Sequence, residues 1–327
     1  MIKPKLIIIS PALAKANNGN WQTARRWAHF LRAGYRVNCR SDWPGSDGSD
    51  HTDLPQAMIA LHARRSAPAI AAFAERCPGR PLVLVLTGTD LYRDIDHDPA
   101  AQRSLQLATR LVVLQAAGLE RLDTALRAKA SVIYQSASPL LPYRPATTPR
   151  HLDVIMIGHL REEKVPDTFM LAAMLVRVPR VRLLHVGAAL DPALGALAVR
   201  TAAATPRYRW LGALPHAQTR QRLKRCALMV ISSRMEGGAN VIIEAVTCGV
   251  PVLASDIAGN RGMLGDDYQG YFPVGDSQAL AMLIDRVACD PAFHATLQRQ
   301  CAARAPLFAP VRENTAVCEL MDNCELY

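Results

Sequence analysis

Short runs of apolar residues alternate with longer amphipathic stretches along almost the whole chain. The runs lack the alternation of apolar and polar positions that marks a half-exposed strand, so we expect strands buried on both faces of a sheet. In the first half the runs are Leu6–Ser10, Tyr35–Cys39, Met58–Leu61, Pro81–Thr87, Leu111–Gln115 and Ser131–Gln135. In the second half they are Leu152–Ile157, Val181–Val186, Tyr208–Leu211, Ala227–Ser232 and Val250–Ala254.

Helical patterns fill the stretches between these runs, for example at Trp21–Ala33 and Ala279–Cys289. A buried strand, a helix and another buried strand form the repeating unit of a parallel sheet with right-handed crossovers. The pattern therefore predicts an α/β fold built from doubly wound, Rossmann-like domains.

A chain of 327 residues is longer than one hydrophobic core usually serves, which predicts two domains. The proline-rich stretch Ser138–His151 interrupts the strand–helix pattern near the middle of the chain, where a hinge would fall. We expect an N-terminal acceptor-binding domain at 1–140, a hinge at 141–150 and a second domain at 151–305. A C-terminal helix within 306–327 could pack back on the first domain.

The formal net charge of +10 narrows the range of partners. The basic residues are spread along the chain and few aromatic residues lie among them, which argues against nucleic acid and favours small anionic substrates. No apolar run approaches the roughly 20 residues that span a bilayer, and Leu6–Ile9 reads as a first strand rather than a signal peptide. The cysteines show neither CxxC pairs nor zinc-site spacing, so we expect reduced thiols, a cytoplasmic location and no bound metal.

The segment from Ser233 to Glu244 carries the most specific chemistry. It follows a predicted strand, and its small residues at 237–239 let backbone N–H groups approach a ligand closely. The helix that follows adds unpaired N–H groups and the positive end of its dipole, so the segment predicts a phosphate-binding turn. The amides concerned belong to Gly237, Gly238, Ala239, Asn240 and Val241.

Two glutamates flank this turn. Glu236 and Glu244 are separated by seven residues, about two helical turns, which would place Glu244 one layer deeper on the same side. A carboxylate there can accept hydrogen bonds from the two hydroxyls of a ribose. On these residues alone, a tight glycine turn with a surface glutamate at each end is the competing interpretation.

The stretch EGGANVIIEAVTCGVPVLAS, which contains Glu236 and Glu244, resembles the signature of the large retaining GT-B glycosyltransferase family often called family 4. The resemblance implies a GT-B fold, with two Rossmann-like domains facing a cleft and a nucleotide sugar on the second domain. It implies that Glu236 lies beside the donor sugar and that Glu244 binds the ribose.

The stretch GHLREEK extends the resemblance, because the family keeps a basic pair here that neutralises the departing diphosphate. Arg161 can fork onto phosphate oxygens and Lys164 can act as a point charge. The family usually has arginine where this chain has His159, so Arg161 is an inferred substitute. Since these cations would do the work of a metal, we expect no metal and no other cofactor. The competing interpretation is a solvated helix start beside Glu162 and Glu163.

The family holds the base of the nucleotide largely through backbone contacts. By the resemblance, Gly187 and Leu211 occupy those positions, after one strand and within the stretch RWLGAL. The neighbouring Trp210 is equally compatible with a place in the core.

Three loops of the first half carry polar and basic residues at the ends of predicted strands. Since the carboxyl ends of parallel strands meet at one edge of a sheet, we expect these loops to form a pocket for a small anionic acceptor. Taken singly, His62 is as compatible with a structural hydrogen bond as with a substrate contact. The residues expected to bind the acceptor are Gly19, Asn20, Thr23, His62, Arg64, Thr87, Gly88, Thr89 and Asp90.

The stretches HARRSA, LTGTDLYRDI, GHLREEK and SRMEGGANVIIEA, with the short first half, are similar to the selenosugar synthases of selenoneine biosynthesis. The similarity runs through nearly the whole chain. It implies UDP-N-acetylglucosamine or UDP-glucose as donor, selenophosphate as acceptor and a new carbon–selenium bond at the anomeric carbon. A selenium anion is nucleophilic without a protein base, and no His–carboxylate dyad stands out in the sequence.

Two other functions stay open. An ordinary family-4 transferase would act on a hydroxyl of a lipid, a polysaccharide or a small molecule. Trp27 and Phe30, in the basic stretch Trp21–Arg36, are compatible with membrane docking of such an enzyme, whereas we expect no membrane association of a selenosugar synthase. A non-catalytic nucleotide-sugar-binding protein would keep the nucleotide contacts without turnover, and the intact basic pair argues against it.

Overall fold

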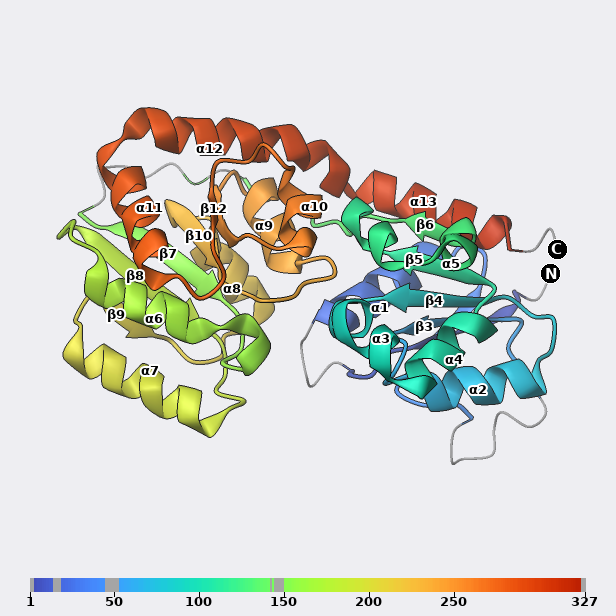
Figure 1. Cartoon of the computed structure of the whole chain (residues 1–327). Coiled ribbons are helices and arrows are strands. Elements are labelled where there is room, and N and C mark those ends of the chain that lie inside the picture. Colours follow the sequence, from blue (N-terminus) through green and yellow to red (C-terminus); the bar gives the residue numbers. More distant parts are fainter. Residues whose placement is uncertain (1–2, 14–18, 45–52, 142, 144–149, 325–327) are drawn as a thin grey trace. The chain divides into compact units, whose positions relative to one another are not determined.

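The computed structural model describes residues 3–13, 19–44, 53–141, 143 and 150–324. The chain forms two compact units (Figure 1). The first comprises the described residues of Met1–Ser136, Glu236–Gly238 and Ala309–Tyr327, and the second those of Ala137–Met235 and Ala239–Phe308. Most of the hinge expected at 141–150 lies outside the described residues.

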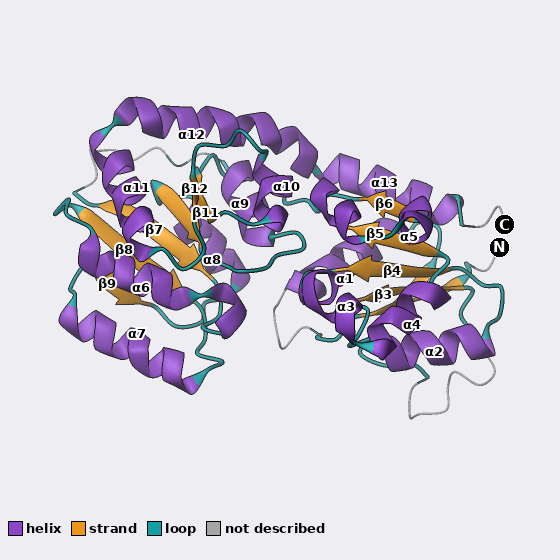
Figure 2. Cartoon of the chain, viewed as in Figure 1, coloured by secondary structure: helices purple, strands orange, loops and turns teal. Residues whose placement is uncertain are grey.

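The first unit is a parallel six-stranded sheet in the order β2-β1-β3-β4-β5-β6 with helices around it (Figure 2). Its strands are β1 Lys5–Ile9, β2 Arg36–Arg40, β3 Ala57–Leu61, β4 Leu82–Leu86, β5 Arg110–Val113 and β6 Ala130–Val132. Its helices are α1 Gly19–Leu31, α2 Ala67–Arg76, α3 Ile95–His97, α4 Pro99–Leu107, α5 Thr124–Ala128 and α13 Pro310–Asp322, with short helical turns at Asp90–Asp94 and Ala116–Arg121.

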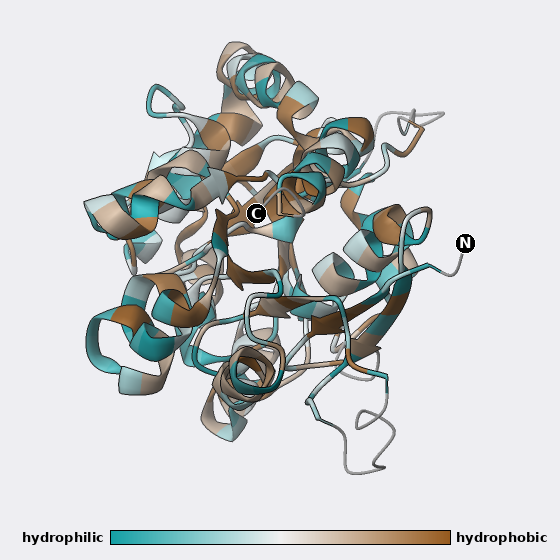
Figure 3. Ribbon diagram, turned by 90° about the vertical axis from the view of Figure 1, so that its right-hand side faces the viewer, coloured by the Kyte–Doolittle hydropathy of each residue, from teal (hydrophilic) through white to brown (hydrophobic). Residues whose placement is uncertain are grey.

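Two apolar layers cover the faces of this sheet, because neighbouring residues of a strand point to opposite sides. Ile7 of β1 belongs to the layer that includes Phe73 of α2. Ile8 belongs to the other layer, with Trp27 of α1 and Met321 of α13. Both faces of the central strands are therefore buried, and in Figure 3 the strands are largely brown while the helices mix brown and teal.

The second unit contains another parallel six-stranded sheet, in the order β12-β11-β10-β7-β8-β9. Its strands are β7 Leu152–Ile157, β8 Val181–Val186, β9 Tyr208–Trp210, β10 Leu228–Ile231, β11 Val252–Ser255 and β12 Tyr271–Phe272. Its helices are α6 Pro166–Leu175, α7 Pro192–Ala204, α8 His216–Leu223, α9 Asn240–Thr247, α10 Ala258–Leu264, α11 Ser277–Cys289 and α12 Pro291–Arg304, with short turns at Glu162–Lys164 and Ala305–Phe308.

Each predicted apolar run overlaps a strand, and the doubly wound α/β fold is confirmed. Some strands differ from the expectation. β2, β6 and β9 are partly exposed because each lies at the edge of its sheet, next to one other strand. β12 is not predicted from the sequence, because a strand of two residues leaves no periodic pattern.

Each sheet has one point at which the chain stops adding strands on one side and begins on the other. This point lies between β1 and β3 in the first sheet and between β7 and β10 in the second. In doubly wound sheets, ligands bind outside the carboxyl ends of the strands at such a point. The loops that follow these four strands are therefore the first places to look for a site.

The C-terminal helix α13 packs on α1 within the first unit. Its Glu313 has a fully buried side chain, which accepts hydrogen bonds from Arg26 Nε at 2.5 Å, Trp27 Nε1 at 2.7 Å and the Ser136 N–H at 2.8 Å. A buried carboxylate is tolerated only when it is paired and hydrogen-bonded. Glu313 therefore joins three parts of the unit that are far apart in the sequence.

All eight cysteines are free thiols. Burial raises the pKa of the Cys226 thiol to about 12, which keeps this group protonated. Among the helices of the described ranges, none has both the length and the apolar character needed to cross a membrane.

Candidate active site

Two loops meet at the switch point of the second sheet, one after β7 and one after β10. The Ser232 hydroxyl, at the end of β10, lies 2.8 Å from the carbonyl oxygen of Lys164 and 3.0 Å from that of Val165. The Arg234 N–H donates to the Glu163 carbonyl at 3.0 Å. These bonds fix the start of the predicted phosphate-binding segment against the loop that carries the basic pair.

Val165, directly after the basic pair, has an unusual backbone conformation. Its φ of 44° and ψ of 53° lie in the left-handed region, which β-branched residues rarely adopt. Such a conformation costs about 1–3 kcal/mol and persists only where its surroundings hold it, often at functional sites. Here the Ser232 hydroxyl binds the Val165 carbonyl, and Pro166 begins α6 immediately afterwards.

The basic pair lies at the carboxyl end of β7. A Cβ atom at Gly158 would meet the side-chain carbons of Lys164 at 3.6 to 3.9 Å, so the lysine stem runs over this glycine. Arg161 is half exposed, but its Nε is shielded from solvent and has no hydrogen-bond partner among the described residues. A buried donor without an acceptor costs about 1–3 kcal/mol, and an oxygen of a bound anion would remove that penalty.

Neither acidic neighbour is hydrogen-bonded to Nε of Arg161. Glu162 is 79 % exposed and accepts a hydrogen bond from Nη1 of Arg234 at 3.0 Å. The Glu163 carboxylate lies 3.9 Å from Arg161 Nε, which is beyond hydrogen-bonding distance. The Nε of Arg161 therefore has no acceptor among the described residues of the loop.

His159 stands where the resembled family usually has arginine, and here it is neutral. Its Nδ1 accepts the Ala188 N–H at 3.0 Å, so the ring proton sits on Nε2. Burial lowers the pKa of His159, and the charges of Arg161 and Lys164 lower it further. The positive charge of this loop therefore comes from Arg161 and Lys164.

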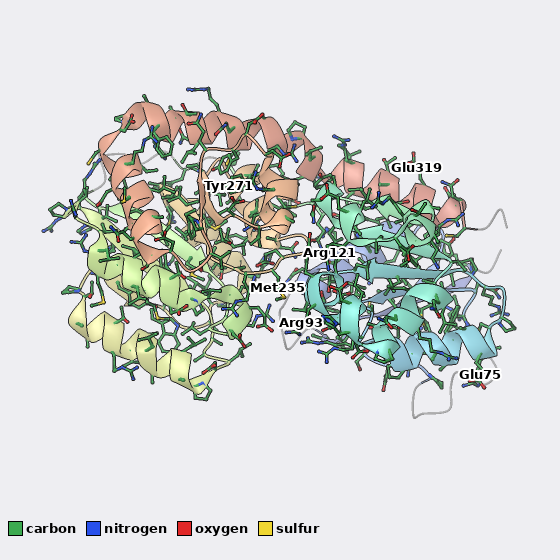
Figure 4. All side chains as sticks on the ribbon, in the orientation of Figure 1. Glu75, Arg93, Arg121, Met235, Tyr271 and Glu319 are labelled. Atoms are coloured by element: carbon green, nitrogen blue, oxygen red, sulfur yellow. The ribbon has the colours of Figure 1, made fainter. Side chains whose placement is uncertain are left out.

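The loop between β10 and α9, marked by Met235 in Figure 4, leads into a helix that begins at Asn240. Its N-cap residue Ala239 has no polar side chain, so no side chain caps the first N–H groups. Glu244 lies about one turn into α9, so the spacing of two helical turns expected from Glu236 is wrong. The reason is that Gly237 and Gly238 precede the helix and are not helical. Of the expected donor residues, Asn240 and Val241 open the helix, and Glu236, Gly237 and Gly238 are assigned to the first unit.

Glu244 has a partner that the sequence pattern does not predict. Its side chain is nearly buried, and Oε1 lies 2.5 Å from Nε2 of His216, the first residue of α8. Oε2 makes no hydrogen bond among the described residues. One carboxylate oxygen is thus held in place while the other can accept a hydrogen bond from a ribose.

Gly187 occupies a place where no side chain fits, since a Cβ atom would stand 1.9 Å from the Gly158 carbonyl oxygen. Its N–H donates to Gly212 at 2.8 Å, and its carbonyl accepts the indole N–H of Trp210 at 2.9 Å. Trp210 is therefore a half-buried residue that fixes this loop. Leu211 is tied through its N–H to the carbonyl of His185 in β8 at 2.8 Å.

In the first unit, one buried carboxylate joins the loops after β3 and β4. Asp90 accepts the N–H groups of Thr87 at 2.9 Å, Gly88 at 2.8 Å and Ala63 at 2.9 Å, and Oγ1 of Thr87 also donates to it. Its side chain has no exposed surface. The expectation that Asp90 binds an acceptor directly is therefore corrected, since a fully buried carboxylate of this kind positions the loops instead.

The structure brings His62, Arg64 and Thr89 together. His62 Nε2 lies 3.0 Å from Thr89 Oγ1, and Arg64 Nε donates to Asp94 at 2.9 Å. The carboxylates of Asp90 and Asp94 each lie 3.9 Å from a ring nitrogen of His62. The sequence does not reveal this proximity, because the aspartates are far from His62 along the chain. Neither carboxylate is within hydrogen-bonding distance of the ring, so these groups do not form a His–carboxylate dyad.

In the first loop of the expected acceptor pocket, only some of the predicted residues are exposed and able to contact a ligand. Gly19 and Asn20 begin α1 and retain exposed surface. Thr23 is 1 % exposed, and its hydroxyl donates to the Gly19 carbonyl at 2.9 Å while accepting from Gln135 Nε2. The expectation of an acceptor contact from the Thr23 side chain is corrected accordingly, because its hydroxyl is buried and already bonded.

Helix α1 packs Trp27 and part of Phe30 against the core of the first unit. Trp27 is fully buried and bonded to Glu313, and Phe30 packs against the same core. Of the two side chains that are compatible with membrane docking, Trp27 is thus an interior residue of the first unit and Phe30 is half-buried.

The part of the chain that carries these loops resembles a known family. Residues 146–306 match the family described as glycosyl transferases group 1. The chain is similar to the sucrose-phosphate synthase of Thermosynechococcus elongatus, with a TM-score of 0.78, 17 % identity and 98 % of each chain covered. It is similar to HepE of Anabaena in complex with UDP-glucose, with a TM-score of 0.78, 18 % identity, and 98 % of this chain and 100 % of HepE covered. The lipopolysaccharide outer core galactosyltransferase WaaB gives a TM-score of 0.66 at 14 % identity over 99 % of each chain.

At such identities the structural similarity establishes the fold, and the family match covers the unit that carries the loops after β7 and β10. The chain therefore has the GT-B fold, and its residues 146–306 match the glycosyl transferases group 1 family.

Proposed function

We propose that the protein is a glycosyltransferase that uses a UDP-sugar, UDP-N-acetylglucosamine or UDP-glucose, and selenophosphate. The selenium attacks the anomeric carbon of the donor. A carbon–selenium bond forms while the bond from carbon to the diphosphate oxygen breaks, and UDP leaves with the bonding electrons. The immediate product keeps the phosphoryl group on selenium, and cleavage of the phosphorus–selenium bond by water gives phosphate and a 1-selenosugar for selenoneine biosynthesis.

The observation that carries the transferase part is the pairing of two loops at the switch point of the second sheet. Ser232 and Arg234 bond the segment after β10 to the loop of Arg161 and Lys164. The arrangement supplies positive charge and uncapped helix N–H groups beside each other, as a departing diphosphate needs. In this proposal Glu236 orients the donor sugar, and the amides of residues 237–241 receive the diphosphate.

The nucleotide part of the proposal rests on Glu244 and on the similar proteins. HepE was solved with UDP-glucose, which makes a uridine nucleotide sugar the first donor to test. The free Oε2 of Glu244 supports a ribose contact, whereas the N–H groups of Gly187 and Leu211 are already bonded within the unit and are not free for the base. The choice between the two sugars depends on the resemblance to selenosugar synthases.

The acceptor part of the proposal rests on the sequence motifs and the net charge of +10. Arg64, which the sequence suggests as an acceptor contact, is already paired with Asp94, and Arg26 of α1 is paired with Glu313. Neutral hydrogen-bond donors must therefore take a larger share in holding selenophosphate than the sequence alone suggests.

The direct test is to mix the purified protein with UDP-N-acetylglucosamine or UDP-glucose and freshly prepared selenophosphate. We expect release of UDP and a sugar product with the isotope pattern of selenium in the mass spectrum. Thiophosphate and phosphate serve as matched controls. Transfer to a lipid or sugar hydroxyl without transfer to selenophosphate would support an ordinary family-4 enzyme instead. Donor binding without turnover on any acceptor would indicate a nucleotide-sugar-binding protein.

Turnover should be independent of divalent metal ions. Arg161 and Lys164 supply the charge that a metal would otherwise bring to the departing diphosphate. We expect the same rate before and after treatment with EDTA, measured as UDP release. A rate that falls with EDTA and returns with Mg²⁺ would contradict this expectation.

Replacing His216 by alanine should weaken donor binding about tenfold with little change in kcat. The bond from His216 holds Oε1 of Glu244, and loss of one such hydrogen bond is worth about 1–1.5 kcal/mol. The measurements are the Kd of UDP by calorimetry and the donor KM.

His216→Gln retains a donor group and should recover part of the affinity. Gln218→Ala, at an exposed position of the same helix, should leave it unchanged. Equal or tighter UDP binding by His216→Ala would show that His216 competes with the ribose rather than orienting Glu244.

A further inference from the structure

A directed chain of hydrogen bonds links the loops after β3 and β4 in the first unit. The Arg65 N–H donates to Nδ1 of His62 at 3.3 Å, and Nε2 of the same ring lies 3.0 Å from Thr89 Oγ1. A ring nitrogen that accepts a backbone N–H carries no proton. The proton of the neutral ring is therefore on Nε2, and His62 donates to the Thr89 hydroxyl oxygen.

This direction decides what Thr89 can offer to a ligand. Its oxygen is used as an acceptor by His62, while its own proton has no acceptor among the described residues. Thr89 is also partly exposed, in contrast to the neighbouring Gly88 and Asp90. The hydroxyl is thus oriented as a hydrogen-bond donor at the carboxyl edge of the first sheet.

Asp90 fixes the two loops that carry this chain of hydrogen bonds. Its carboxylate binds Ala63 in the loop after β3 and both Thr87 and Gly88 in the loop after β4. These hydrogen bonds lie next to a residue with a strained backbone, since His62 has a φ of 76°. Strain of this kind persists where the surroundings over-determine the conformation, and it often marks sites that must be pre-organised.

Burial, more than the surrounding charges, favours the neutral form of the His62 ring. Burial lowers the pKa of His62 below its ordinary value of 6.5, Asp90 and Asp94 raise it, and Arg65 and Arg64 lower it. Asp94 is itself bonded to Arg64 and Arg93, which reduces its pull on the ring. Protonation of Nδ1 would break the bond from the Arg65 N–H and disturb the chain.

We propose that Thr89 is an obligate hydrogen-bond donor to an anionic oxygen of the acceptor and that His62 and Asp90 are positioning residues that do not touch the acceptor. The inference rests on the proposed function, because it assigns the phosphoryl oxygens of selenophosphate as the group recognised. A donor hydroxyl prefers a charged oxygen, since such bonds are stronger than those between neutral groups. Recognition by Thr89 also fits a pocket in which Arg64 is already paired.

The test compares Thr89→Val with Thr89→Ser. Valine keeps the branched shape but removes the hydroxyl, whereas serine keeps the donor. We expect the KM for selenophosphate to rise about 10- to 100-fold in Thr89→Val and to stay within about threefold of wild type in Thr89→Ser. The Kd of UDP, measured by calorimetry, should be the same in both variants.

The positioning role of His62 has a separate signature. His62→Ala should raise the KM for selenophosphate as Thr89→Val does, and the double variant should be no worse than Thr89→Val alone, because both changes remove one interaction. His62→Gln, which retains a donor amide, should recover part of the affinity. If the His62 variants fail to fold, the comparison of valine and serine at position 89 still decides the proposal.

The outcomes separate this inference from the proposed function. If the wild type neither binds UDP nor releases it from a UDP-sugar, the proposed function fails and the inference fails with it. If the wild type uses selenophosphate and Thr89→Val retains the wild-type KM for it, only the inference is overturned. The same holds if the two substitutions at Thr89 raise that KM equally.

Discussion

Replacing Lys164 by alanine should lower kcat by about two orders of magnitude or more. The departing diphosphate gains negative charge in the transition state, and removal of one pre-organised stabilising group typically costs about 10²–10³ in rate. The lysine is well placed for this task, because its stem runs over Gly158 and its backbone carbonyl is bonded to Ser232. The measurement is UDP release at saturating donor and acceptor.

Two matched variants control this result. Lys164→Arg keeps the charge and should retain more activity than the alanine variant. Lys224→Ala removes a lysine at the end of α8, outside the two loops, and should leave kcat unchanged. A near-wild-type rate for Lys164→Ala would remove this residue from the active site, and an equal loss in the Lys224 variant would indicate a general effect of charge.

Replacing Glu313 by alanine should destabilise the first unit by about 3–5 kcal/mol, because removal of one partner leaves a buried charge unpaired. The side chain is fully buried and receives bonds from Arg26, Trp27 and Ser136, which would all lose their acceptor. The loss should appear as a fall of about 10 °C in the melting temperature of this unit. Glu313→Gln, which keeps some of these bonds, should lose less.

Glu319 provides the matched control for this stability measurement. It lies on the same helix α13, at an exposed position, and is labelled in Figure 4. Glu319→Ala should change the melting temperature by no more than about 2 °C, as is usual for exposed sites. Equal effects of the two alanine variants would show that helix α13 itself, and not the buried carboxylate, governs the stability of the unit.

The strands of both sheets and the candidate donor loops were predictable because their signals are local. A strand buried on both faces is a continuous apolar run, so runs such as Leu152–Ile157 coincide with strands. The phosphate-binding segment was predictable because its glycines and the start of a helix lie within a few residues of one another. The exact start of the helix was not predictable in this way, because the helix of Glu244 begins only at Asn240 and the turn before it is not helical.

Whether a residue predicted to bind a ligand is free to do so depends on partners that lie far away along the chain. Thr23 and Asp90 have the residue types and positions of ligand contacts, yet both are buried by partners elsewhere in the fold. His216 carries no sequence signal at all and is recognised only by its bond to Glu244. Polar side chains at a strand end look alike in sequence, whether they face a ligand or another loop.

The sequence by itself determined the alternation of strands and helices, the parallel sheets and the loops in which a site would lie. Only the tertiary structure decided the strand order, which sets the loops after β7 and β10 side by side, and the partners of each charged group. The physical reason is that burial and periodicity act between residues a few positions apart, whereas pairs such as Arg26 and Glu313 form only after the whole chain has folded. The direction of the bond from His62 to Thr89 likewise exists only once two loops are brought together.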